Sequence, residues 1–207
     1  MVQSLGYLKE TASQTAGPYV HIGCMPNFAG IHGVFASDLG SGSLCNDRTR
    51  GERITVRGFV YDGTGTPLKD AMVEIWQADT DGLYKSPAET GGKADPDFAG
   101  WGRQPGDMET GEFRFETIKP GRAPFRDSDP RLMAPHILFW VVARGINIGL
   151  QTRMYFSDED VANAEDPILS RIEHRVRVPT LIGKRDGSTV RFDIHLQGDN
   201  ETIFFDM

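Results

Sequence analysis

The chain has 207 residues, of which 39% are hydrophobic and 10% aromatic, which is enough for the core of one domain and excludes bulk disorder. Its formal net charge of −7, without a block of Lys or Arg, argues against binding to nucleic acid or to an anionic membrane surface. No apolar run has spanning length and residues 1–15 lack the pattern of a secretory leader, so we expect a cytoplasmic protein. Its two cysteines, Cys24 and Cys45, are expected to be reduced thiols.

The N-terminal segment SQTAGPYVHIG, residues 13–23, has no strong helix or strand pattern. Gly17 allows another group to approach the backbone closely, and Pro18 fixes a rigid bend. Two interpretations stay open: an ordinary turn into the first core segment, or a segment laid against a ligand or a partner. Residues 24–50 then form a long Gly- and Asp-rich loop.

Residues 53–79 predict two strands joined by a glycine-rich turn at residues 62–65. The motif ADTDGLY at 78–84 resembles the start of a calcium loop but lacks the third carboxylate and the bidentate glutamate, so we expect a hairpin turn. Residues 84–110 are expected to be a second long loop, and loops of this length commonly serve recognition, active sites or oligomer contacts. In GEFRFETI, residues 111–118, the alternation predicts a strand.

The apolar segment LMAPHILFW at 132–140 reads as a buried strand, and HILFWVVARGI, residues 136–146, is apolar on both faces, which places it at the centre of a sandwich. His136 lies within it, and a lone histidine in an apolar strand is more often a core residue bonded to a carbonyl or carboxylate than a metal ligand. No H-x-H, H-x-x-x-H or H-E-x-x-H pattern occurs, so no complete metal site can be read locally. Arg144 is suited equally to holding a carboxylate and to a surface ion pair.

The C-terminal third predicts one helix and several short strands. The helix begins after Ser157, with Asp160 in a capping-box position, and Pro167 breaks or kinks it. TRMYF, TLIGKR and the terminal ETIFFDM are short strand candidates, and STVRFDIHLQ at 188–197 alternates with period two, leaving His195 on the wet face. The whole pattern predicts an all-β sandwich of seven to nine strands, with long loops and one or two short helices, as one domain over residues 1–207.

Six segments together resemble the intradiol ring-cleavage dioxygenases, and they cover essentially the whole chain. They are QTAGPYVHIG, GFVYDGTGTPLKDAMVEIWQADTDGLY, DPDFAGWGR, GEFRFETIKPG, APHILFWVVARGINIGLQTRMYF and RFDIHLQGDNETIFFDM. The resemblance implies the family's β-sandwich fold. It also implies the family's activity, which opens a catechol ring between its two hydroxyls with dioxygen at an Fe(III) held by two tyrosines and two histidines.

The same resemblance implies that this chain has lost the iron. The family's four ligand positions fall on Thr90, Ala123, His136 and Leu138. Only His136 is a residue type of that ligand set, and one imidazole cannot replace two phenolates and two imidazoles around a hard ferric ion. His136 is then the remnant of a ligand pair. In the family such a chain pairs with a beta subunit that binds the Fe(III).

An alpha-type chain of this kind is implied to line the substrate cavity of its partner's iron. The positions that match are Thr15, Gly17, Pro18, Tyr19 and Arg144. Arg144 would attract the carboxylate of a small aromatic acid substrate. Residues 1–50 are correspondingly expected to contact the partner chain, and a higher alpha–beta assembly is expected.

Two other interpretations remain at this stage. Residues 58–79 alone would also suit a transthyretin-like or carbohydrate-associated β-sandwich that binds a ligand without enzymatic activity. A self-sufficient metalloenzyme with an unrecognised ligand set is the other. The segments at 14–19 and 144–156 argue against the binding module.

Overall fold

The computed structural model describes residues 15–17, 19–126, 129–146 and 149–206. Within that part, strands dominate and the helices are short. The elements are α1 (Val20–Cys24), β1 (Arg53–Tyr61), β2 (Met72–Trp76), β3 (Trp101–Pro105), β4 (Glu112–Ile118), β5 (Pro124–Arg126), β6 (Asp129–Leu132), β7 (His136–Val142), β8 (Leu150–Phe156), α2 (Asp160–Glu165), the 3₁₀ helices η1 (Leu169–Arg171) and η2 (Arg175–Leu181), β9 (Ile182–Asp186), β10 (Thr189–Arg191) and β11 (Ile194–His195).

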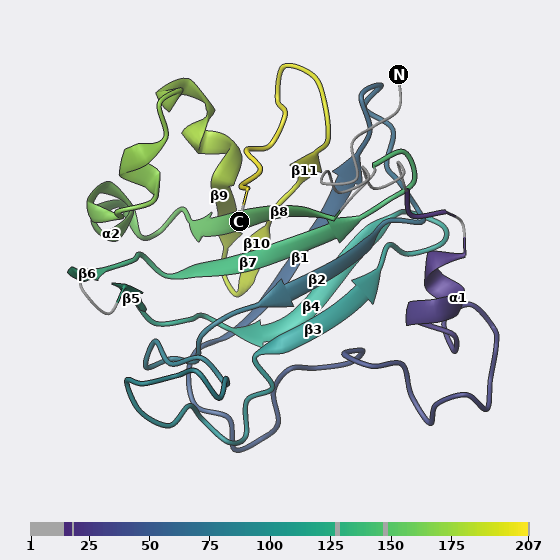
Figure 1. Ribbon diagram of the computed structural model, residues 1–207, viewed down its shortest axis with the longest axis horizontal. Coiled ribbons are helices and arrows are strands. Elements are labelled where there is room, and N and C mark those ends of the chain that lie inside the picture. The colour runs from purple at the N-terminus through teal and green to yellow at the C-terminus, as the bar shows by residue number, and fades with distance from the viewer. Residues whose placement is uncertain (1–14, 18, 127–128, 147–148, 207) are drawn as a thin grey trace, which may run out of the picture.

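The strands form two layers that are joined at one side (Figure 1). In the first layer β3, β2, β7 and β8 are neighbours and all their pairings are antiparallel. In the second layer β4 pairs antiparallel with β1, and β10 and β11 pair parallel with β1. The link is β9, which pairs with both β8 and β10. The predicted all-β fold is therefore confirmed, although the strands are more numerous and shorter than expected.

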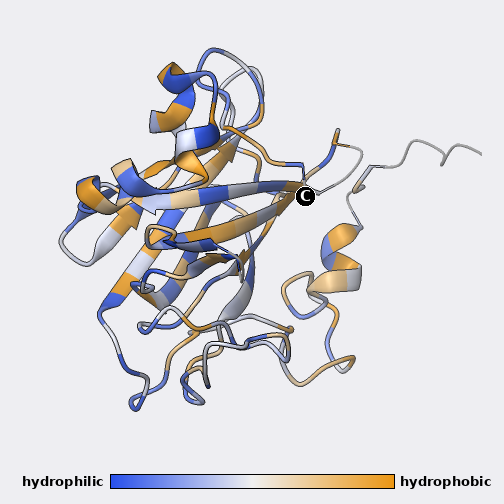
Figure 2. Ribbon diagram, turned by 60° about the vertical axis from the view of Figure 1, so that its left-hand side comes forward, coloured by the Kyte–Doolittle hydropathy of each residue, from blue (hydrophilic) through white to orange (hydrophobic). Residues whose placement is uncertain are grey.

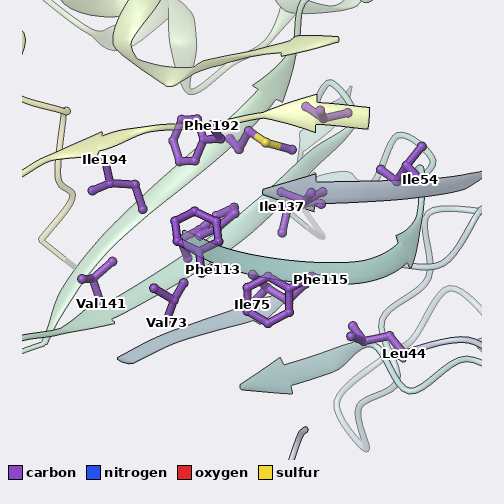
Figure 3. Packing of buried hydrophobic residues seen from close by; sticks show 14 of the residues in the cluster. Leu44, Ile54, Val73, Ile75, Phe113, Phe115, Ile137, Val141, Phe192 and Ile194 are labelled. Atoms are coloured by element: carbon purple, nitrogen blue, oxygen red, sulfur yellow. The ribbon is translucent and has the colours of Figure 1, made fainter. Parts of the chain in front are cut away.

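The core lies between the two layers and is built from the inward side chains of both. The rings of Phe113 on β4 and Phe139 on β7 have centroids 6.0 Å apart, and Phe139 lies 5.1 Å from Phe192 in the second layer. Figure 3 shows Phe113 and Phe192 between the layers, with aliphatic residues of the same cluster around them. Aromatic contacts of this kind add to the free energy gained by burying apolar area.

The strand β7 shows the period-two rule that the sequence predicts. Ile137, Phe139 and Val141 point into the core and are fully buried. His136, Leu138 and Trp140 consequently point to the opposite side, which we call the outer face of the first layer. The central position of β7, between β2 and β8, is confirmed. The expected strand over 132–140 is wrong at its start, because Leu132 ends β6 and β7 begins only at His136.

Three further expectations are wrong at the level of elements. The expected loop 84–110 contains β3, an edge strand that pairs only with β2 and so does not need the apolar alternation of a central strand. The short helix α1 begins inside the segment 13–23, at Val20, and ends at Cys24. The terminal residues 201–206 form no strand; Thr202 and Phe205 make single backbone hydrogen bonds to different strands, to His195 and Gln151.

The predicted helix after Ser157 begins later than expected. Ser157 Oγ accepts a hydrogen bond from the backbone N–H of Arg185 at 3.0 Å instead of capping a helix, and α2 starts at Asp160 without a side-chain cap. Pro167 does end the helical run, because η1 beyond it is a separate turn. Tertiary contact with β9 therefore overrides the local capping pattern.

The expected strand at 188–197 is divided into β10 and β11. Phe192 donates its N–H to the Arg57 carbonyl at 2.9 Å, and Asp193 Oδ1 accepts the N–H of Phe59 at 3.2 Å, so a side chain replaces one bond of the ladder. The turn at 62–65 is confirmed, with Asp62 accepting three bonds from Thr64 and Thr66. The strands on either side of that turn lie in different layers.

Two smaller expectations have outcomes as well. Cys24 and Cys45 are both free, as predicted. Asp79 organises the expected turn at 78–84 by accepting the N–H groups of Asp81 and Leu83, but the chain continues into a loop rather than into a paired strand. Within the described ranges, no helix is both long and apolar enough to cross a bilayer.

Candidate functional site

A block of four side chains occupies the outer face where β7 and β8 lie side by side. His136 pairs with Tyr155, and Leu138 pairs with Arg153, in the antiparallel register. Because side chains directly opposite each other in such a ladder are in contact range, the four form one patch. His136 is 2% exposed, and Tyr84, from the loop after β2, covers it.

His136 has both ring nitrogens occupied. Its Nδ1 lies 2.8 Å from the Ala134 carbonyl oxygen, which can only accept, so Nδ1 carries the proton. Nε2 is then the acceptor, and the Tyr84 hydroxyl donates to it at 3.2 Å. Burial, together with the nearby positive charge of Arg153, lowers the pKa of His136 to about 4. The expectation of a core histidine bonded to a carbonyl is confirmed.

The two phenols beside His136 are held in their protonated form. Burial raises the pKa of Tyr84 to about 12, and its ring stacks on Trp76 with centroids 5.9 Å apart. Burial also raises the pKa of Tyr155, whose hydroxyl donates to Asp166 Oδ1 at 3.3 Å. Both phenols therefore serve as hydrogen-bond donors at neutral pH and are not the anionic oxygens that a ferric ion prefers.

The four positions named by the family resemblance do not form a donor set. Thr90 lies exposed on the loop before β3. Ala123 is buried in a small apolar cluster with Ala78 and Met133, and Leu138 lines the outer face. Alanine and leucine side chains carry no donor atom, so His136 is the one imidazole of the four. In the described ranges, no three His, Cys, Asp or Glu side chains come together as a possible metal group.

An aromatic groove continues along the outer face from this block. It has a volume of about 160 Å³ and contains all three tryptophans of the chain. Its lining residues are Glu74, Ile75, Trp76, Trp101, Leu138, Phe139, Trp140 and Gln151. Trp140 is 37% exposed there and packs over Gly149, where a Cβ would lie 1.9 Å from the indole nitrogen. The sequence analysis did not predict this groove. The feature that could have indicated it is the outward position of Trp76 and Trp140 on adjacent strands.

A second cluster brings together two of the predicted cavity residues. The backbone N–H of Gly145 donates to Thr15 Oγ1 at 3.0 Å, which places the N-terminal segment beside Arg144. The Arg144 side chain is 61% exposed and forms an ion pair with Asp70. Of the two functions considered for Arg144 from the sequence, the surface ion pair is present, and most of the side chain remains open to solvent.

The other predicted cavity residues lie on the surface. Gly17 has no atom within 4 Å of the position that a Cβ would take, and Tyr19, just before α1, is 74% exposed. Pro18 lies outside the described residues. Thr15, Gly17 and Tyr19 thus share the margin of the molecule that carries α1, which Figure 2 shows outside both sheet layers.

The two clusters lie at opposite ends of β7. His136 begins the strand, Val142 ends it, and Arg144 follows. A strand rises about 3.3 Å per residue, so the six steps from His136 to Val142 span roughly 20 Å. Figure 1 shows β5 and β6 near the first end and α1 beyond the second. Thr15 and Arg144 therefore cannot line a pocket around His136 of their own chain.

Residues 19–39 expose an unusual number of large apolar side chains. Six of the eleven exposed large hydrophobic residues in the described structure lie there: Tyr19, Ile22, Ile31, Val34, Phe35 and Leu39. We call these six the N-terminal apolar patch. Scattered apolar residues are common on surfaces, but a concentration in one short segment is typical of an interaction site.

Comparison with known proteins gives consistent matches. A family model described as Dioxygenase matches residues 26–198. Over 203 residues the chain is 44% identical to the protocatechuate 3,4-dioxygenase alpha chain of Pseudomonas putida, covering 96% of this chain and 97% of that protein. Over 179 residues it is 34% identical to the protocatechuate 3,4-dioxygenase beta chain of Burkholderia cepacia, covering 82% and 75%.

Solved structures agree on the fold. Catechol 1,2-dioxygenase from Pseudomonas arvilla C-1 aligns with a TM-score of 0.54 at 22% identity, over 77% of this chain and 56% of that one. At this identity the likeness concerns the fold alone. The sequence matches extend far beyond residues 58–79, the one segment that would also have suited a non-enzymatic binding module.

Proposed function

The chain belongs to the intradiol ring-cleavage dioxygenase family, and from this premise we propose that it is the alpha-type subunit of a heteromeric protocatechuate 3,4-dioxygenase. In this proposal the chain itself binds no iron. A beta-type partner holds the Fe(III), and the present chain completes the substrate cavity. The complex opens the ring of protocatechuate with dioxygen to give 3-carboxy-cis,cis-muconate.

The extent of the sequence matches supports the subunit assignment. The similarity to an alpha chain covers nearly all of both proteins, whereas the similarity to a beta chain is lower and covers less of each. Two chains with such related sequences are expected to share one fold, so they can pair through equivalent surfaces. We infer a heteromer in which each chain presents the same side of the fold to the other.

The observation that carries the proposal is the separation of the two clusters along β7. Thr15 and Arg144 lie about 20 Å from His136, and the chain's own iron-ligand positions offer one imidazole, already bonded to Tyr84. A cavity lined by Thr15 and Arg144 therefore requires a metal that another chain contributes. The N-terminal apolar patch lies in the same segment and supplies a surface for that chain.

The residues of this chain have physical tasks in that cavity. Bound Fe(III) would supply a Lewis acid that lowers the pKa of the catechol hydroxyls and templates its reaction with oxygen. The proposal assigns Gly17 and Pro18 to the wall beside the flat ring, because glycine allows close approach to the backbone and proline restricts its conformation. Arg144, oriented by its ion pair with Asp70, attracts the substrate carboxylate. Correct placement of the ring is worth a large factor in rate, so both subunits contribute to turnover.

The test is co-expression of this chain with a beta-type dioxygenase subunit. We expect the two to co-purify, and the complex to consume oxygen when protocatechuate is added, with the ring-opened tricarboxylate as product. This chain alone should neither consume oxygen when protocatechuate is added nor form the ring-opened product. A lone chain that cleaves protocatechuate, or a beta-type subunit that never associates with it, would contradict the proposal.

A further inference from the structure

A buried cluster around His136 still contains the donor types of a metal site. One imidazole and two phenols, His136, Tyr84 and Tyr155, converge there, with a hydroxyl-to-ring-nitrogen bond of 3.2 Å and ring centroids of His136 and Tyr155 5.7 Å apart. Nitrogen and phenolic oxygen are donors that transition metals accept. The missing ligands are therefore not the only feature of this chain that could decide whether the cluster binds a cation.

Arg153 gives a second reason. It is directly opposite Leu138 in the ladder between β7 and β8, on the same face as His136 and Tyr155. Its Nη1 lies 3.4 Å from Met133 Sδ, and its guanidinium carbon lies 5.9 Å from the centroid of the Phe205 ring. These neighbours are uncharged. In the described ranges no carboxylate lies within ion-pair distance of Arg153, unlike Arg103, which pairs with Glu74 on the same layer.

No carboxylate in the part of the chain that the structure describes pairs directly with Arg153. The buried carboxylate of Asp166 also acts on this cluster, but it accepts hydrogen bonds from the Tyr155 hydroxyl and from backbone N–H groups, and its effect on His136 is smaller than that of Arg153. A guanidinium stays protonated at any physiological pH, and in a half-buried environment its repulsion of another cation is only weakly screened. Its influence reaches the potential donors, because its charge disfavours the protonated form of His136 and favours the anionic form of Tyr84. At His136 the field of the Arg153 guanidinium thus outweighs that of Asp166, and it opposes the approach of a metal ion.

We propose that Arg153 makes the buried cluster around His136 unfavourable for metal cations, as a barrier separate from the missing ligands. Restoring donors at the lost positions would then leave metal affinity weak until the guanidinium is also removed. This inference rests on the proposed absence of iron from this chain and adds the residue that enforces it.

The test creates a minimal donor pair in the full-length chain. Leu138→His places a second imidazole two residues from His136 on the same face of β7. Co²⁺ affinity, by calorimetry and by the visible d–d absorption band, is compared between Leu138→His and Leu138→His with Arg153→Gln. We expect the variant without the guanidinium to bind Co²⁺ at least tenfold more tightly. The control combines Leu138→His with Arg114→Gln, on β4 in the other layer, and should leave the affinity unchanged.

Equal Co²⁺ affinities with and without Arg153, including no binding by either variant, would overturn the inference. If Leu138→His unfolds the chain, Leu138→Cys replaces it, because cysteine is apolar when protonated and its thiolate gives an intense charge-transfer band with Co²⁺. The Co²⁺ affinities of Leu138→Cys with and without Arg153→Gln are then compared in the same way. Stoichiometric iron in the unmodified chain would instead contradict the proposed function, so the two failures are distinguishable.

Discussion

His136 shows how far one residue can be understood from sequence. Its place in an apolar strand predicted a buried imidazole bonded to a carbonyl, and the Ala134 carbonyl provides that bond. The sequence could not predict that Tyr84, 52 positions earlier, donates to the other nitrogen, because loop residues 77–100 have no periodicity that fixes where their side chains point. The position of Arg153 beside His136 was not predicted either, because it depends on the register between β7 and β8, which the sequence does not specify.

A pH dependence of stability follows from the environment of His136. Burial lowers its pKa to about 4 in the folded chain from the ordinary histidine value of 6.5, so between these pH values the unfolded state binds the additional proton. Stability is fully present above pH 6.5 and is lost as the pH falls toward 4, by about 3 kcal/mol from this group. Urea unfolding at pH 7.5 and pH 4.5 measures the effect.

Replacing the histidine separates its contribution from those of the carboxylates. His136→Leu should be less stable than the parent at pH 7.5, because the Tyr84 hydroxyl and the Ala134 carbonyl lose their partner, and it should lose less stability on acidification. His174→Gln, at an exposed site, serves as the control. An unchanged acid sensitivity in His136→Leu would show that this imidazole is not buried in its neutral form.

Arg144 is the residue whose substitution tests the cavity most locally. In the complex with a beta-type subunit, Arg144→Ala should raise the KM for protocatechuate about tenfold and leave kcat and iron content nearly unchanged, because it removes a charge that attracts the substrate anion. Steady-state oxygen consumption measures this. Arg191→Ala, which breaks a comparable exposed pair with Asp193, should leave both constants unchanged; an unaltered KM in Arg144→Ala would remove Arg144 from the cavity.

At the scale of elements, the strands with a clear alternation were predictable and the irregular ones were not. β1, β4 and β7 each bury alternate residues in the core, which is the signal that period-two reasoning detects. β3 carries little of that signal, since an edge strand needs only one partner. The division between β10 and β11 arises from a close approach to β1, which no local pattern records.

That close approach predicts a strong effect of one methyl group. A Cβ on Gly58 of β1 would lie 1.8 Å from the Phe192 carbonyl oxygen, and both atoms belong to the interior of the second layer. Gly58→Ala should destabilise the chain by about 3 kcal/mol or more, because the backbone must move to relieve the clash. Gly23→Ala, where nothing lies within 4 Å, is the matched control. Equal unfolding midpoints in urea for the two variants would contradict the packing described.

The N-terminal apolar patch predicts where the partner binds. Val34→Asp combined with Phe35→Ser should weaken association with a beta-type subunit by at least tenfold while leaving the melting temperature of the isolated chain unchanged, because both side chains are exposed. Calorimetric titration of the two purified chains measures the affinity. Val176→Asp, on η2 and 89% exposed, should have no effect. If only Val176→Asp weakened the association, the partner would bind near η2 and not at the N-terminal apolar patch.

At the scale of the whole molecule, family membership was available from the sequence because long segments along the entire chain carry it, and the comparisons confirm it. The proposed division of labour between two chains was also suggested by the sequence, through the residues Thr90, Ala123 and Leu138 at the family's ligand positions. The structure adds the separation of Arg144 and His136 along β7 and the hydrogen bond that occupies His136 Nε2, neither of which the sequence specifies.

Metal analysis of the isolated chain and of its complex with a beta-type subunit tests the central claim most directly. Elemental analysis and the visible tyrosinate-to-iron absorption should show no stoichiometric iron in this chain alone. In the complex, both should report iron in an amount equal to that of the beta-type subunit. A lone chain that carries one ferric ion per polypeptide, with that absorption band, would contradict the account.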